Sequence, residues 1–204
     1  MELDFNRQIK LSNNGGSLSS DTGELLIREF DEKIGFSRTL GKYVEIKDDR
    51  LYHTYSNGEL LRQKIYQVIA GYAEDNAADQ LTNDPVFTQI IGTETLASQP
   101  SLSRLFLRFD ENSIDQMNEA NQEILDKVHQ YRDSKSIILD LDSTHSDTFG
   151  DQEDTTFNSH YGTVGFHPIV AFDGITGVFF KAKLRPGNVY TSNGFRSKRS
   201  KNND

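Results

Sequence analysis

The sequence changes its hydrophobic pattern near residue 134, and this change constrains the fold more than any other feature does. Before it, apolar residues recur at helical spacing in segments separated by glycine, proline and polar residues. After it, residues 137–142, 168–173 and 178–184 have the short apolar runs of strands, and the stretch DGITG predicts a hairpin turn. We therefore predict an α+β chain, with a helical region over residues 1–134 and the beginning of a sheet over residues 135–204.

Within the helical region, the pattern predicts one short strand and then helices. Alternation of apolar and polar residues predicts the strand over residues 5–11. Asp21 and Glu24 have the spacing of a capping box. The predicted helices are one that follows Asp21 and ends at Gly35, one from near Gly58, one over Val86–Ile91, one from Pro100-Ser101 and one over about Ser113–Tyr131. Residues from Ser143 to about Gly165 are polar and are predicted to form a loop.

Composition limits the classes of protein to consider. Of the 204 residues, 35% are hydrophobic and 26% are charged, and no apolar run approaches the roughly 20 residues that cross a bilayer. The start MELDFNRQIK lacks the apolar segment of a signal peptide, so we expect a cytoplasmic protein with no membrane partner. The absence of cysteine excludes disulfides and thiolate metal sites.

Charge is distributed unevenly along the chain. The formal net charge of −9 argues weakly against nucleic acid as a partner. The end of the chain is basic, however, and the tail FRSKRSKNND from about residue 195 is predicted to be either a solvated, disordered end or a phosphate-binding tail. The basic residues of this end are Arg185, Arg196, Lys198, Arg199 and Lys201.

Two aspartates follow the apolar residues of the first predicted strand. Side chains alternate between the faces of a strand, so Ile138, Asp140 and Asp142 share one face. The two carboxylates could end the strand and cap a turn, act in phosphoryl transfer, or hold a metal ion.

The stretch from Asp140 to Thr144, Asp-Leu-Asp-Ser-Thr, resembles the first motif of haloacid-dehalogenase-like phosphatases. That resemblance implies that Asp140 is a nucleophile and that Asp142 moves a proton. Its surroundings fit poorly, because about 135 residues precede the strand and an antiparallel hairpin is predicted after it. Carboxylates that hold two divalent metals, as in ribonuclease-H-like domains, fit these surroundings better.

A second resemblance covers residues 10 to about 194. The chain resembles the bacterial insertion-sequence transposases of the DDE class (DDE domain group 1). The stretches that carry this resemblance are SNNGGSLSSDTGELLIREFDEKIGF, LLRQKIYQVIAGYAEDNAADQLTNDPVF, LASQPSLSRLFLRF, LDLDSTHSDTFGDQEDTTFNSHYGTVGFHPIVAFDG and LRPGNVYTSNG.

The resemblance implies DNA cleavage and strand transfer at element ends, by a ribonuclease-H-like domain with three carboxylates and Mg²⁺ (or Mn²⁺). It assigns the first carboxylate to Asp142, with Asp140 in reserve. The second Asp and the Glu of this triad are expected after the Arg185–Asn188 segment and are missing, so we expect a C-terminally truncated domain with little or no catalysis alone. A non-catalytic remnant that binds DNA, or that pairs with full-length transposase or with itself as a dimer, is the alternative.

Other polar residues of the second part are assigned more modest roles. Asp173 is predicted to be a turn residue about 16 Å from Asp142, too far to share a metal. The acids of the loop are predicted to be solvated, although any of them could approach a metal; they are Asp147, Asp151, Glu153 and Asp154. For His160 and His167 we expect a structural or substrate-side role rather than a zinc site.

The best candidate for a DNA-reading element lies over residues 84–109. A helix that ends at Gly92 and a second that opens with Ser101, Ser103 and Arg104 resemble a helix-turn-helix. The connection Thr93–Pro100 is longer than the usual turn, so an ordinary capped packing helix is the alternative.

Overall fold

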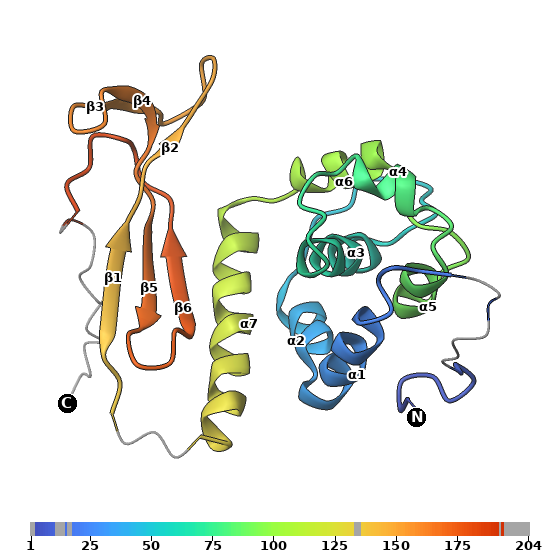
Figure 1. Ribbon diagram of the computed structural model, residues 1–204. Coiled ribbons are helices and arrows are strands. Elements are labelled where there is room, and N and C mark those ends of the chain that lie inside the picture. Colours follow the sequence, from blue (N-terminus) through green and yellow to red (C-terminus); the bar gives the residue numbers. More distant parts are fainter. Residues whose placement is uncertain (1–2, 11–14, 16–17, 133–135, 192, 194–204) are drawn as a thin grey trace. The chain divides into compact units, whose positions relative to one another are not determined.

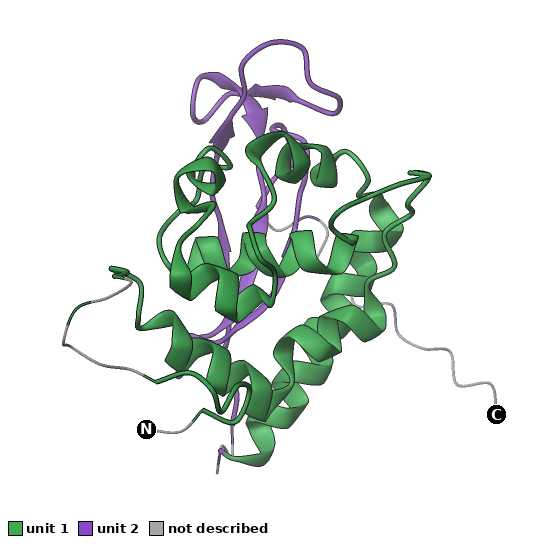
Figure 2. Cartoon of the chain, turned by 90° about the vertical axis from the view of Figure 1, so that its right-hand side faces the viewer, with its two compact units in different colours: residues 1–131 green, residues 132–204 purple. Residues whose placement is uncertain are grey.

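The computed structural model describes residues 3–10, 15, 18–132, 136–191 and 193, and it divides the chain into two compact units (Figures 1 and 2). Unit 1 is Met1–Tyr131 and unit 2 is Arg132–Asp204. The change in sequence pattern near residue 134 therefore falls close to the division. No helix in the described ranges is both long enough and apolar enough to cross a membrane.

All regular elements in the described part of unit 1 are helices, and those in the described part of unit 2 are strands. The predicted α+β class is therefore confirmed. They are α1 (Glu24–Ile34), α2 (Phe36–Tyr43), α3 (Asn57–Ile69), α4 (Ala77–Leu81), α5 (Pro85–Ile91), α6 (Gln99–Phe106) and α7 (Glu111–Gln130). The predictions near Gly58, over Val86–Ile91, at Pro100 and over Ser113–Tyr131 correspond to α3, α5, α6 and α7. The short helices α2 and α4 were not predicted, because one or two turns carry too little periodicity to detect.

The start of unit 1 corrects two predictions. The strand over residues 5–11 is wrong, since the described residues there form turns and the Asp4 and Phe5 N–H groups both donate to the Glu29 carboxylate. The capping box is also wrong, because Gly23 is the N-cap of α1 and provides no side-chain cap. Gly35 does end α1, in the left-handed conformation at φ 72° that favours glycine.

Two hydrophobic clusters hold unit 1 together. The first joins α1 to α3, α4 and α5 through residues such as Leu25, Tyr66 and Phe87. The second joins α3 to α4 and α6 through residues such as Leu60 and Leu102. Both clusters include residues of α3 and of α4, so these two helices connect the clusters.

Unit 2 contains the predicted three-stranded antiparallel sheet. Its strands are β1 (Leu139–Ser143), β5 (Ile169–Asp173) and β6 (Phe179–Lys183), in the order β1-β5-β6. The register places Asp140 opposite Phe172 and Asp142 opposite Val170. The pairings predicted from the apolar runs and the DGITG turn are confirmed, with ends that differ by one or two residues.

The predicted loop from Ser143 to Gly165 is wrong, because it forms a second small sheet. The strands are β2 (Ser146–Asp147), β3 (Thr156–Asn158) and β4 (Thr163–Phe166), in the order β2-β4-β3. Close backbone approach helps to hold it: a Cβ at Gly165 would lie 2.2 Å from the Ser146 carbonyl oxygen. Strands of two to four residues are too short to show alternation, and so the sequence pattern missed them.

The interior of unit 2 is mostly polar. Among its described residues, the apolar side chains that are buried are Ile169 and Ala171, whereas the buried polar ones are Asn158, His167, Asp173 and Arg185. Several large apolar side chains of the sheet are exposed, including Ile138 at 59% and Leu139 at 54%. Hydrogen bonds therefore contribute much of the order inside this unit.

Candidate functional site

Asp140 and Asp142 lie on one face of β1, as predicted from strand alternation. Their Cα atoms are two residues apart on a strand, a separation of about 6.6 Å. Each faces an apolar cross-strand neighbour, Phe172 for Asp140 and Val170 for Asp142. Both aspartates are exposed, and within the described residues no hydrogen bond or ion pair uses either carboxylate. The pair is therefore available to a ligand from solvent.

Carboxylate oxygens of this kind suit a hard divalent cation such as Mg²⁺. Two of them are a partial ligand set, because such cations take six or more oxygen ligands, some of them water. Among the described residues, no further acidic side chain and no histidine joins Asp140 and Asp142 in a group that could hold a metal ion. The arrangement fits part of a carboxylate metal site.

Asp173 is placed where the sequence predicted, at the hairpin turn. Asp173 pairs with Leu139 and lies three residues along β5 from the cross-strand partner of Asp142. Its side chain projects to the face opposite to that of Asp142. Its carboxylate accepts hydrogen bonds from Thr176 Oγ1 at 2.6 Å and from Ile175 N at 3.1 Å. These bonds, the one from Thr176 first, lower the pKa of Asp173 below its usual value. Asp173 therefore stabilises the turn.

The acidic residues of the segment that was predicted to be a loop have interactions that do not involve the carboxylate pair on β1. Asp147 Oδ1 accepts a hydrogen bond from Thr163 Oγ1 at 2.8 Å and lies 3.0 Å from His145 Nε2. Asp151, Glu153 and Asp154 are exposed on the segment between β2 and β3. The structure gives Asp147 a local partner within the small sheet and leaves the other three acids solvated.

In unit 1, the predicted DNA-reading residues belong to α6. Leu102 and Leu105 are fully buried and pack this helix on the core. The two serines face local partners: Ser103 Oγ donates to Asp75 Oδ2 at 2.9 Å, and Ser101 Oγ lies 3.3 Å from Ser98 Oγ. Arg104 is exposed and is the residue of the predicted set that remains open to a ligand.

Arg104 belongs to a cation cluster that the sequence pattern did not reveal. Arg108 is partly buried near Arg104 and Arg50, and burial and then the Arg50 charge lower its pKa. Its Nε and Nη2 atoms are buried and have no hydrogen-bond partner among the described residues. Asp48 is the acid that pairs with Arg50, at 2.6 Å. Besides burial, the charges of Arg50 and Arg104 lower the pKa of Arg108 and the charge of Asp48 raises it, and we call Arg50, Arg104 and Arg108 the cation cluster.

Sequence reasoning missed Arg50 and Arg108 for different reasons. Arg108 follows Arg104 by four residues, and this spacing was a usable signal. Arg50 comes from the segment between α2 and α3, and its approach to α6 depends on tertiary structure.

Arg185 has an internal role in this structure. It is 3% exposed, and its Nε donates to the His167 carbonyl at 2.9 Å. Its Nη1 reaches the carbonyls of Tyr190, Thr191 and Asn193, so it ties down the segment after β6. Burial lowers its pKa. The remaining predicted basic residues, Arg196, Lys198, Arg199 and Lys201, lie outside the described residues, and their predicted DNA contacts stay predictions.

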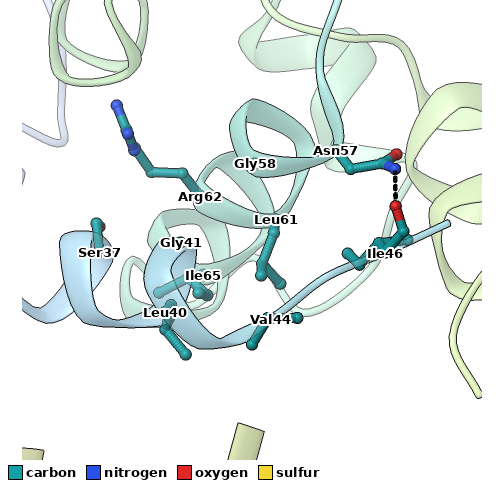
Figure 3. Close-up of a pocket in the computed structure, with 10 residues that line it drawn as sticks. All are labelled: Ser37, Leu40, Gly41, Val44, Ile46, Asn57, Gly58, Leu61, Arg62 and Ile65. Atoms are coloured by element: carbon teal, nitrogen blue, oxygen red, sulfur yellow. Dashed lines mark hydrogen bonds between the residues drawn. The ribbon is translucent and has the colours of Figure 1, made fainter. Parts of the chain in front are cut away.

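One cavity lies between α2 and the start of α3 (Figure 3). Leu40, Val44 and Leu61 line it together with Ile65, and Asn57 Nδ2 donates to the Ile46 carbonyl at its side. Its volume is about 80 Å³, below the roughly 300 Å³ at which ligand pockets begin. It is a packing gap between two helices rather than a site.

Comparison with known proteins identifies one family. The model of the family described as Transposase DDE domain group 1 matches residues 1–199. Neither the curated proteins nor the solved structures give a match.

Proposed function

The chain belongs to the transposase DDE domain group 1 family, and from this membership we propose that it acts in DNA transposition through the carboxylates of Asp142 and Asp140. Transposition is the ancestral function of this family, whose members generally use divalent metals and bind DNA. The single observation that supports the assignment to these residues is their shared, exposed face on β1.

In this proposal unit 2 is the beginning of a ribonuclease-H-like domain, and unit 1 engages DNA. The antiparallel order β1-β5-β6, with carboxylates on the first strand, supports the first part. Asp142 is the primary metal ligand and Asp140 the second. A bound Mg²⁺ or Mn²⁺ would supply activation of water or of a 3′-hydroxyl, and stabilisation of the leaving oxygen.

The two-carboxylate site also determines how much catalysis we expect from the 204 residues alone. Two carboxylates provide a small part of a cation's ligand set, so we expect weak binding, with a Kd in roughly the millimolar range. We propose that this polypeptide alone does not cleave DNA, and that it functions either with further carboxylates or as a DNA-binding partner of another transposase chain.

The phosphatase alternative loses support from the fold. A parallel strand–helix–strand unit starting at Ile137 would have supported the phosphatase. The strand that pairs with β1 is antiparallel, and the segment between them forms the small sheet β2-β4-β3.

The experiment that tests the function is a rescue. The chain is continued with a C-terminal segment that carries the second Asp and the Glu from another member of the family, and is assayed on DNA with that member's element ends. We expect Mg²⁺-dependent cleavage that Asp142→Asn reduces by about 10³-fold or more, a loss of about 4 kcal/mol in transition-state stabilisation. Asp151→Asn, which changes an exposed acid outside the pair, serves as the matched control and should keep the activity.

The competing outcomes are distinct. Cleavage that survives Asp142→Asn would remove this residue from the site. Turnover of a phosphate monoester by the original chain, lost in Asp140→Asn, would establish the phosphatase instead.

We also propose that the cation cluster of Arg50, Arg104 and Arg108 contacts the DNA backbone. A phosphate there would provide an acceptor beside the partly buried Arg108 guanidinium and would offset the repulsion among the three charges. This proposal keeps the predicted contact through Arg104 and makes it a backbone contact rather than a base-reading one.

A further inference from the structure

Unit 2 contains a pocket beside the end of β1 that neither the carboxylate pair nor the cation cluster explains. We propose that it holds one unpaired nucleobase of a DNA strand. The pocket has a volume of about 360 Å³, within the roughly 300–1,000 Å³ range of ligand sites. Its walls come from the end of β1, the turn between β3 and β4, and the segment after β6. The rings among its lining residues are Phe157, His160, Tyr161, His167 and Tyr190.

Tyr161 provides the platform for a base. Its ring stacks on His145 with centroids 4.8 Å apart and an interplanar angle of 17°. His160 meets it nearly perpendicularly, at 4.8 Å and 86°. Tyr161 is nevertheless 46% exposed. His167 also meets the Tyr161 ring at a steep angle, with centroids 6.1 Å apart and an interplanar angle of 64°. A tyrosine ring that is held by these neighbours and is still half open can stack a planar ligand on its exposed part.

The walls are held in place by buried polar side chains. Asn158 Oδ1 accepts from the His160 and Tyr161 N–H groups, and its Nδ2 donates to the Gly187 carbonyl at 2.6 Å. Arg185 ties the far wall through the carbonyls of Tyr190 and Thr191. The shape of the pocket is therefore built before a ligand arrives, which reduces the entropy lost on binding.

His167 adds a defined polar group. It is 6% exposed, and its Nδ1 lies 2.8 Å from the Val189 carbonyl oxygen. A carbonyl can only accept, so Nδ1 donates this hydrogen bond, and in the tautomer with a proton on Nδ1 alone Nε2 is an acceptor. A lining of this kind suits the edge of a base, which combines donors and acceptors.

Charge indicates the class of ligand. None of the lining residues is Lys, Arg, Asp or Glu, so the pocket suits a neutral group rather than a phosphate or a metal ion. Amides and hydroxyls accompany the rings: Ser143, Asn158, Ser159, Asn188 and Thr191. Ser143 and Thr191 bond each other at 3.0 Å, and Asn158 is engaged by the pocket walls, so Ser159 and Asn188 are the side chains left for the polar edge of a base.

The position of the pocket connects it to the proposed function, on which the choice of DNA as the ligand rests. Ser143, which lines the pocket, directly follows Asp142 on β1. The two side chains project to opposite faces of the strand. A DNA strand whose unpaired base enters the pocket would thus pass the end of β1 that carries Asp142.

The test uses the full chain without metal, so that it does not depend on cleavage. Two otherwise identical DNA duplexes are compared, one fully paired and one with a single bulged 2-aminopurine. We expect the bulged DNA to bind about 10-fold more tightly, with a change in 2-aminopurine fluorescence on stacking. Tyr161→Ala should remove this difference, whereas Tyr161→Phe, which keeps the ring, should preserve it. Phe149→Ala changes a ring that is 90% exposed outside the pocket and should have no effect.

A second comparison changes the DNA instead of the protein, so that a folding defect in Tyr161→Ala cannot account for the result. Replacing the bulged base by an abasic site leaves the protein unchanged and should reduce binding to the level of the paired duplex. Equal binding of the bulged and abasic DNA, or a difference that persists in Tyr161→Ala, would overturn the proposal. This assay contains no metal and measures no cleavage, so failure of the rescue experiment and failure of this one are separable.

Discussion

At the scale of single residues, two buried glutamines on α3 show how the same side chain can stabilise or destabilise. Gln63 donates through Nε2 to the Ala97 carbonyl and accepts through Oε1 from the Ala97 N–H, both at 2.9 Å. Gln67, one turn further on, is fully buried, and neither amide atom has a partner among the described residues. A buried amide without partners costs free energy, whereas the paired one satisfies a buried backbone.

The same substitution should therefore have opposite effects at the two positions. Gln63→Met should lower the free energy of unfolding by about 2–3 kcal/mol, because it leaves both polar groups of Ala97 unpaired. Gln67→Met should raise it by about 1 kcal/mol, because the side chain keeps its length and loses two unpaired atoms. Urea unfolding of each variant measures both values. A fall in the free energy of unfolding in Gln67→Met would contradict the prediction for that position.

The sequence could identify α3 but not this contrast. Leu60 and Leu61 fall at helical spacing and are buried, as the period predicted. Val68 and Ile69 share that pattern yet are about half exposed, whereas Gln63 and Gln67 are buried. The hydrogen bonds of Gln63 go to Ala97, 34 residues away, and a local period carries no information about such a contact.

At the scale of elements, α6 is the helix whose role can be tested most directly. The sequence left open a recognition helix or an ordinary packing helix, and in the structure its serines face local partners while Arg104 is exposed. Each phosphate contact releases counterions from the DNA. A plot of the logarithm of the binding constant against the logarithm of the salt concentration therefore has a slope of about −0.9 per contact. Arg104→Ala should weaken binding to any duplex and reduce this slope by about 1.

A control for α6 is Lys33→Ala, which removes an exposed positive charge on α1 that has no interaction with the cation cluster among the described residues. Lys33 pairs loosely with Glu29, at 3.4 Å. The slope for this variant should equal that of the original chain. Sequence-dependent loss of affinity in Arg104→Ala would instead restore base reading by α6.

At the scale of the whole molecule, the two units should differ in stability. Unit 1 has two apolar clusters, whereas the sheet β1-β5-β6 leaves Ile138, Leu139 and Phe179 at least 40% exposed. We expect the backbone amides of β1 and β6 to exchange with solvent at least about 10-fold faster than those of α3. Hydrogen exchange with mass spectrometry measures this, and equal protection in both units would contradict it.

The sequence predicted the larger architecture of the molecule and missed its smallest parts. The change of pattern near residue 134, the hairpin and the shared face of Asp140 and Asp142 all follow from local periodicity. The small sheet β2-β4-β3 does not, because its strands are two to four residues long, and the pocket around Tyr161 does not, because its walls depend on contacts such as Asn158–Gly187, 29 residues apart. His160 and His167 were expected to be structural or substrate-side, and both line the pocket.

The polar interior of unit 2 has a thermal consequence. Exposure of apolar surface raises the heat capacity on unfolding, by about 0.45 cal/K/mol per Å², and exposure of polar surface lowers it, by about 0.26. Unit 2 buries Asn158, His167 and Arg185 beside few apolar side chains, so these contributions should largely cancel. Its stability curve should then be flat with temperature, without the pronounced maximum that an apolar core produces. Cooling would weaken the helical unit before it weakened this one.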